Sequence, residues 1–241
     1  MTQESIIQQT ESWIKSVVID CNFCPFAAKA LFKKSIRYVV IDRADKTGAL
    51  ESLKEEMHYL DENDATETTL IIFPNDFTDF GSYLSLVKQA ERSLSKQGYE
   101  GIYQIASFHP DYLFAGSDAD DAANYTNRSI YPMLHLLREE SISKVLSTYK
   151  NPELIPEHNM AFARNKGLQY MQVLRASCMN GWIMRNVIAR RNDEAISHIA
   201  LINLRLLLRQ LAEKQWRIGT FIFYWSAATV KFSTLFWYTV K

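Results

Sequence analysis

TLIIF, at residues 69–73, is a short apolar run of the kind found in buried β-strands, and Pro74 ends it. Similar runs flank it, IRYVVI at residues 36–41 and IYQIASF at residues 102–108. Because the chain between successive runs is long and helical in pattern, the runs are expected to pair as parallel strands. The sequence therefore predicts an α/β fold, with a small three-stranded parallel sheet covered by helices. The helical patterns rest on Leu50, Leu53, Met57 and Leu60, and on Phe80, Tyr83, Leu84, Val87 and Leu94.

Further helices are expected on both sides of this unit. Apolar spacing predicts a first helix over residues 4–19, and Pro25 predicts the first residue of a second, with Cys24 as its cap. After the third strand, helices are predicted over three stretches, residues 132–139, 141–149 and 156–175.

Length and composition limit the classes to which the protein can belong. The chain has 241 residues, 47% of them hydrophobic, and 27 basic residues balance 27 acidic ones. Zero net charge gives no electrostatic case for a nucleic-acid partner. Three cysteines are too few for a disulfide scaffold, and the first residues, MTQESIIQQTESW, have no features of a secretory signal. A soluble, cytoplasmic protein is the expectation.

Although the net charge is zero, the charges are unevenly distributed along the chain. Residues 181–241 carry nine basic and three acidic residues and four of the five tryptophans. This shift predicts a domain over residues 1–177 and an atypical basic, aromatic-rich tail over residues 178–241, either a read-through or fusion segment or an added layer of the fold. A helix is predicted at residues 199–211. Only residues 219–240 are long and apolar enough to suggest membrane contact.

The loop after the third strand is the main candidate for a site. Ligands of α/β sheets usually bind where the strands end, and this loop is the most polar in the chain. His109 is the expected acid/base group, with Asp111 or Asp121 orienting its ring. A small polar or anionic ligand would be held by Asn124, Asn127, Arg128 and His135, the last sharing a predicted helix face with Glu139.

Two other interpretations of these side chains remain open. Asp and Asn also build turns by bonding their own backbone, so the loop could be purely structural. A set of His109, Asp111, one of Asp118–Asp121 and His135 would suit a divalent metal ion, but no recognised metal-binding spacing is present, so no metal site is predicted.

Cys24 is the alternative catalytic candidate. At the predicted N-terminus of a helix its thiol would have a lowered pKa, as in thiol redox proteins. The other reading is a small buried cysteine packed beneath the first helix. A Rossmann or Walker nucleotide-binding motif is excluded, because only 8 glycines are present and no phosphate-binding glycine motif occurs; whether the protein uses another cofactor is left open.

Four short stretches of the chain resemble a known family. Residues 107–112 read SFHPDY, residues 124–129 read NYTNRS and residues 131–139 read YPMLHLLRE, while residues 22–27 read NFCPFA. In this combination the chain is similar to the bacterial domain of unknown function 1415 family over about residues 5–175, with the tail outside it. The resemblance implies no reaction, ligand or catalytic residue. An enzyme, a non-catalytic interaction module and a thiol redox protein therefore all remain candidate classes, and the oligomeric state is not predicted.

Overall fold

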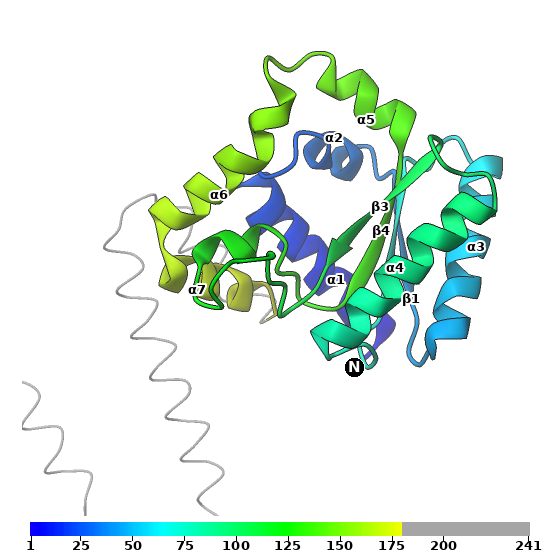
Figure 1. The fold of residues 1–241 in the computed structure, drawn as a ribbon, viewed down its shortest axis with the longest axis horizontal. Coiled ribbons are helices and arrows are strands. Elements are labelled where there is room, and N and C mark those ends of the chain that lie inside the picture. Colours follow the sequence, from blue (N-terminus) through cyan, green and yellow to red (C-terminus); the bar gives the residue numbers. More distant parts are fainter. Residues whose placement is uncertain (180–241) are drawn as a thin grey trace, which may run out of the picture. The chain divides into compact units, whose positions relative to one another are not determined.

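The computed structural model describes residues 1–179 (Figure 1). The predicted tail, including its helix at 199–211 and the apolar stretch 219–240, lies outside these residues except for Cys178 and Met179, which end the last helix. In the described part, no helix is long and apolar enough to cross a membrane. The elements in chain order are α1 (Gln3–Trp13), the π-helix η1 (Ile14–Ile19), α2 (Ala27–Phe32), β1 (Ile36–Val40), α3 (Lys46–Glu62), β2 (Thr68–Ile72), α4 (Phe80–Lys96), β3 (Tyr103–Phe108), the 3-10 helix η2 (Ala122–Thr126), β4 (Met133–Arg138), α5 (Glu139–Leu146), the 3-10 helix η3 (Pro152–Leu154), α6 (Ile155–Lys166) and α7 (Leu168–Met179).

The fold is of the expected α/β class, but its sheet is mixed. The strand order is β1-β2-β4-β3, with β1 and β2 parallel and β4 antiparallel to both of its neighbours. The prediction of three adjacent parallel strands is therefore wrong, because β4 lies between β2 and β3. At the centre of the sheet, His135 of β4 pairs with Leu70 on one side and Ala106 on the other.

The helix predicted over residues 132–139 is wrong, because Met133–Arg138 form the strand β4. Its sequence MLHLLR has apolar residues on both faces, since Leu134 and Leu136 enter one core and Met133 is buried on the opposite face. A strand covered on both sides shows no alternation of polar and apolar residues, so a run of six cannot be distinguished from a buried helix by spacing. His135 and Glu139 consequently do not share a helix face, because Glu139 begins α5.

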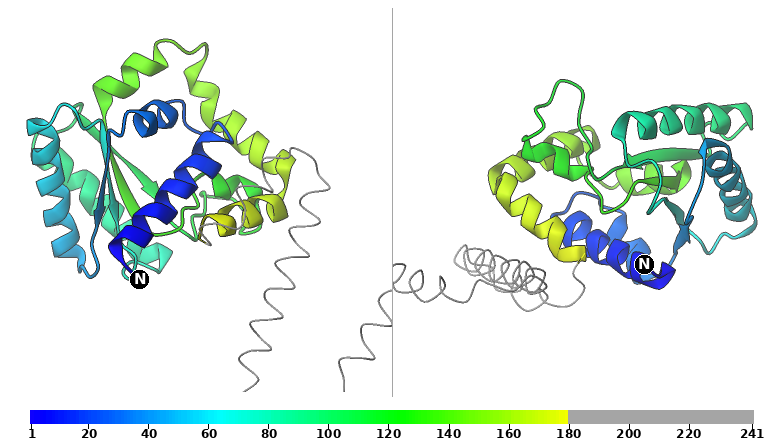
Figure 2. Two further views of the ribbon diagram at one scale, coloured as in Figure 1. Left: turned by 180° about the vertical axis from the view of Figure 1, so that it is seen from behind. Right: turned by 90° about the horizontal axis from the view of Figure 1, so that it is seen from below.

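Helices α3 and α4 cover one face of the sheet. Their apolar faces form a closed core with alternate residues of β2 and β4, and the right-hand view of Figure 2 shows α4 and α1 on opposite sides of the sheet. Both helices begin with an aspartate cap: Asp45 accepts the N–H of Gly48 and Asp79 that of Ser82. The fully buried members are Ala49, Leu53, Met57, Leu60, Ile71, Phe73, Tyr83, Leu86, Ala90, Leu134 and Leu136.

The other face of the sheet meets the N-terminal segment and a second group of helices. The predicted first helix forms as α1 followed by the π-helix η1. Trp13 at the end of α1 and Ile14 and Val17 of η1 are all buried. The second helix begins at Ala27 and not at Pro25, so Cys24 lies three residues before it and is not its cap. Residues 139–166, comprising α5, η3 and α6, form an arch that leaves the end of β4 and returns toward η2 (Figure 1).

Candidate functional site

His109 follows β3 and is completely buried beside the rings of Phe80 and Tyr83. Its Nε2 lies 2.9 Å from the carbonyl oxygen of Phe77, and its Nδ1 lies 3.0 Å from the backbone nitrogen of Asp111. Because a carbonyl only accepts, Nε2 carries the proton and Nδ1 accepts the Asp111 N–H. Burial lowers the pKa of His109. The ring is thus a neutral bridge between two loops, with both nitrogens engaged.

Asn124 and Arg128 are also bonded within the loop. The Asn124 amide accepts the N–H of Phe114 at 3.1 Å and donates to the carbonyl of Asp118 at 2.8 Å, and the residue is completely buried. The Arg128 guanidinium donates from Nε to the carbonyl of Tyr112 and from Nη2 to that of Ala119, both at 3.0 Å. These bonds satisfy the polar backbone of a long loop, as turn-forming side chains do.

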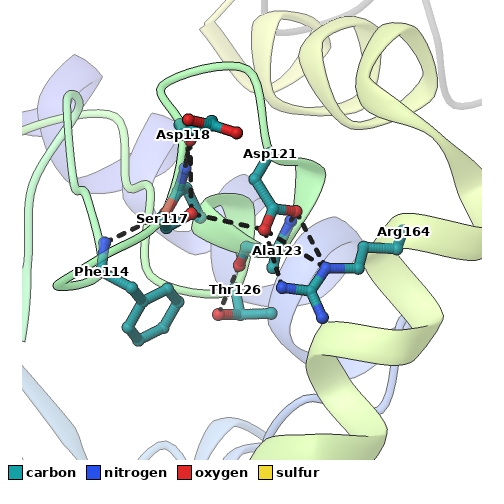
Figure 3. A network of polar contacts seen from close by, with 8 residues as sticks. Phe114, Ser117, Asp118, Asp121, Ala123, Thr126 and Arg164 are labelled. Carbon is teal, nitrogen blue, oxygen red and sulfur yellow. Dashed lines mark hydrogen bonds and ion pairs between the residues drawn. The ribbon is translucent and has the colours of Figure 1, made fainter.

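Asp121 connects this loop to the arch (Figure 3). Its carboxylate accepts the N–H of Ala123 at the start of η2 and receives the Arg164 guanidinium of α6 at 2.7 Å. This pairing with Arg164 lowers the pKa of Asp121 to about 2. Asp111 has an exposed side chain, and in the described chain no carboxylate bonds to the His109 ring.

Three of the predicted site residues meet at one cavity on the α1 side of the sheet. Cys24, Asn127 and His135 line a cavity of about 700 Å³. The other predicted residues do not line it: His109, Asp111, Asp121, Asn124 and Arg128. The chain therefore does not bring His109 and His135 to a common site. In residues 1–179, no group of three or more His, Cys, Asp or Glu side chains could hold a metal ion.

Elements from the whole described chain build this cavity. The sheet provides its floor through alternate residues of four strands, among them Ile36, Leu70, Ala106 and Leu137. Trp13 of α1 closes one side, and the arch covers another. The arch contributes Ile142, Val145, Ile155, Asn159 and Met160, and the loop after β3 contributes Phe114, Thr126 and Asn127.

His135 is the polar group at the centre of this floor. Its Nε2 lies 2.7 Å from Thr68 Oγ1, whose own hydroxyl donates to the carbonyl of Leu136 at 2.6 Å. Since the Thr68 proton is used there, Nε2–H donates to Thr68 and the proton-free Nδ1 is left as an acceptor. Burial lowers the pKa of His135 to about 4, so the ring is neutral at physiological pH.

Replacing His135 with glutamine is expected to flatten the pH dependence of stability. The unfolded chain binds this proton near pH 6.5 and the native chain only near pH 4, so the stability from neutral His135 is complete above pH 6.5 and is lost as the pH falls toward 4. The free energy of unfolding of the unmodified protein should fall more steeply in this window, by up to about 1.4 kcal/mol per pH unit. Urea unfolding of both proteins across the window measures the difference, and equal slopes would contradict it.

Cys24 is half-buried on the cavity wall. Burial raises the pKa of its thiol, although hydrogen bonds from the N–H groups of Phe26 and Ala27 oppose the rise. The thiol is therefore protonated at neutral pH, which disfavours it as a nucleophile. Cys21, Cys24 and Cys178 are all free.

Several lining residues were not anticipated from the sequence. Lys29 of α2 and its C-cap residue Lys33 are four residues apart, a spacing that places both side chains on the same side, and Gln104 follows the alternation that puts Ala106 on the floor. The spacing of the lysines and the alternation along β3 can be recognised in the sequence. However, nothing in the sequence shows that α2 and the arch face the same side of the sheet as His135.

One of three comparisons with known proteins found a match for this chain. Neither the curated proteins nor the solved structures contain a significant match to the chain. The model of one protein family, described as a protein of unknown function (DUF1415), matches residues 5–173, and the residues beyond 173 lie outside it. The match covers more than half of the chain, from α1 into α7, and includes every strand of the sheet. The chain therefore belongs to the DUF1415 family.

Proposed function

We propose that this domain binds a small molecule with an apolar body in the cavity between the sheet and the arch. One observation carries the proposal: α5 is amphipathic, yet none of its residues is buried. Its apolar side chains Ile142 and Val145 instead line the cavity opposite the sheet and are half-buried. An apolar helix face that borders a cavity and stays half-buried has space for another apolar group.

The size and chemistry of the cavity support this proposal. A volume of about 700 Å³ falls in the range of roughly 300–1,000 Å³ typical of small-molecule sites, whose walls are apolar with a few placed polar groups. Each Å² of apolar surface that a ligand removes from water contributes about 25 cal/mol. The neutral His135 Nδ1 would accept a hydrogen bond from the ligand and orient it on the floor.

The loop after β3 contributes only a few side chains to the proposed binding cavity. Phe114, Thr126 and Asn127 contribute to the cavity wall, whereas the internal hydrogen bonds of His109, Asn124 and Arg128 support a scaffold role. The low pKa of His135 makes it a weak base at neutral pH, and the raised pKa of Cys24 does not favour thiol redox chemistry. Reversible binding is thus the function that the geometry favours over turnover.

Replacing Ala106 with phenylalanine is expected to block binding. Ala106 lies on the floor beside His135, so the added ring would project into the cavity and occupy the space of the ligand. The affinity for the neutral fluorescent dye Nile red should fall at least about tenfold, equivalent to 1.4 kcal/mol, with no loss in stability to urea. Fluorescence titration of purified protein measures the affinity.

The matched control is Ala161→Phe, which adds the same ring to an exposed position of α6 outside the cavity. It should bind the dye as the unmodified protein does. If the unmodified protein does not bind the dye, or if both variants bind equally well, the cavity is not the binding site and the proposal is wrong.

A further inference from the structure

We infer that the ligand carries an anionic group that binds to Lys29 and Lys33, an inference that rests on the proposed function. Lys29 lies in α2 and Lys33, four residues later, is the C-cap of that helix; both line the cavity, and both are exposed. Within residues 1–179, neither forms an ion pair. They thus place two available positive charges at the solvent side of the cavity, above an apolar floor.

Acidic side chains do not balance this positive pair in the described part of the chain. Among residues 1–179, Glu67 is the one acidic residue that lines the cavity, and its Oε1 accepts the Ser141 hydroxyl at 2.9 Å. Arg138 directs its guanidinium to backbone carbonyls at the end of α3, including those of Asn63 and Thr66. His135 is neutral. Among the described residues, the two lysines are therefore the cations that line the cavity without a hydrogen bond or ion pair inside the protein.

The lysine pair has a cost that a bound anion would offset. Lys29 in the last turn of α2 and Lys33 at its C-cap are like charges four residues apart, which repel each other, and α2 contains no acidic residue that could pair with either. An anion between the two ammonium groups would replace this repulsion with two attractive contacts. The residues on the floor beneath are Ile36, Leu70 and Leu137.

The inferred ligand class is an amphipathic organic anion. Its head group would contact Lys29 and Lys33, and its apolar body would extend over the sheet below α5. A lysine ammonium is a point charge that binds carboxylate and phosphate alike, so the shared chemistry is an anionic head on an apolar chain.

Four probes with the same ten-carbon chain test the head group: decanoate, decyl phosphate, decanol and decylammonium. Each displaces Nile red from the purified full-length protein, and fluorescence reports the affinity. The anions should bind about tenfold more tightly than decanol, equivalent to 1.4 kcal/mol, and decylammonium should bind most weakly. Comparing decanoate with decyl phosphate distinguishes a free organic acid from a phospholipid-type head as the source.

The double variant Lys29→Gln, Lys33→Gln should bind decanol as before but lose the preference for the anions. The control Lys54→Gln, Lys88→Gln removes two exposed charges from α3 and α4 and should keep it. If decanol binds as tightly as decanoate, or if the preference survives in the first variant, the anionic ligand is wrong while the cavity stands. If neither Nile red nor any probe binds, the proposed function fails and this inference with it.

Discussion

Replacing His109 with alanine is expected to lower the free energy of unfolding by about 3 kcal/mol. The change removes a completely buried ring, leaving a cavity against Phe80 and Tyr83. It also leaves the Phe77 carbonyl and the Asp111 N–H without their partner, and each such loss costs roughly 1 kcal/mol or more when the group is buried. Urea unfolding monitored by circular dichroism measures the effect.

This result would separate a structural role of His109 from a catalytic one. A catalytic histidine in a cleft is usually replaceable with little loss of stability, whereas a buried bridge between two loops is not. His158→Ala is the control, because His158 is an exposed residue of α6 and its removal should change stability by less than about 0.5 kcal/mol. A loss below 1 kcal/mol for His109→Ala would contradict the bridging role.

Replacing Trp13 with alanine is expected to cost about 4 kcal/mol, the largest effect of a single substitution predicted for this domain. Trp13 is 1% exposed, and its ring packs edge-on against Phe108 at 5.2 Å between centroids. Its indole N–H donates to the Arg128 carbonyl at 3.2 Å. The side chain therefore holds α1, the end of β3 and the loop after β3 together, and it also closes one side of the cavity.

A second substitution at Trp13 separates the contribution of the hydrogen bond from that of the packing. Trp13→Phe keeps most of the apolar volume and the contact with Phe108 but removes the hydrogen bond to Arg128, so it should cost about 1 kcal/mol plus a smaller packing loss. Equilibrium unfolding in urea measures both variants. If the phenylalanine variant is as unstable as the alanine variant, the hydrogen bond and not the packing dominates, contrary to this expectation.

Both predictions concern the loop after β3. From the sequence, this loop can be interpreted either as a ligand site or as a purely structural loop. Its polar residues are of the types that occur in sites and also of the types that build turns. In the structure the bonds of His109, Asn124 and Asp121 run to loop backbone and to Arg164. A loop held in this way presents Phe114 and Asn127 to the cavity in a fixed position.

The sequence by itself determined the positions of α3 and α4 and of the strands β1, β2 and β3. A helix with one apolar face repeats with its 3.6-residue period, and the three strands lie at short apolar runs separated by these helical segments. Membership of the DUF1415 family over residues 5–173 was also readable, since it depends on motifs that are continuous in the chain.

Only the tertiary structure decided the position of β4 and the composition of the cavity. A short apolar run fits a buried helix as well as a buried strand, so the spacing of residues 133–138 could not show that β4 forms and inserts between β2 and β3. That insertion moves His135 from an expected helix surface to the centre of the floor. Partners such as His109 and Phe77, 32 residues apart, meet only when the chain packs, because side-chain hydrogen bonds depend on distance in space and not on sequence separation.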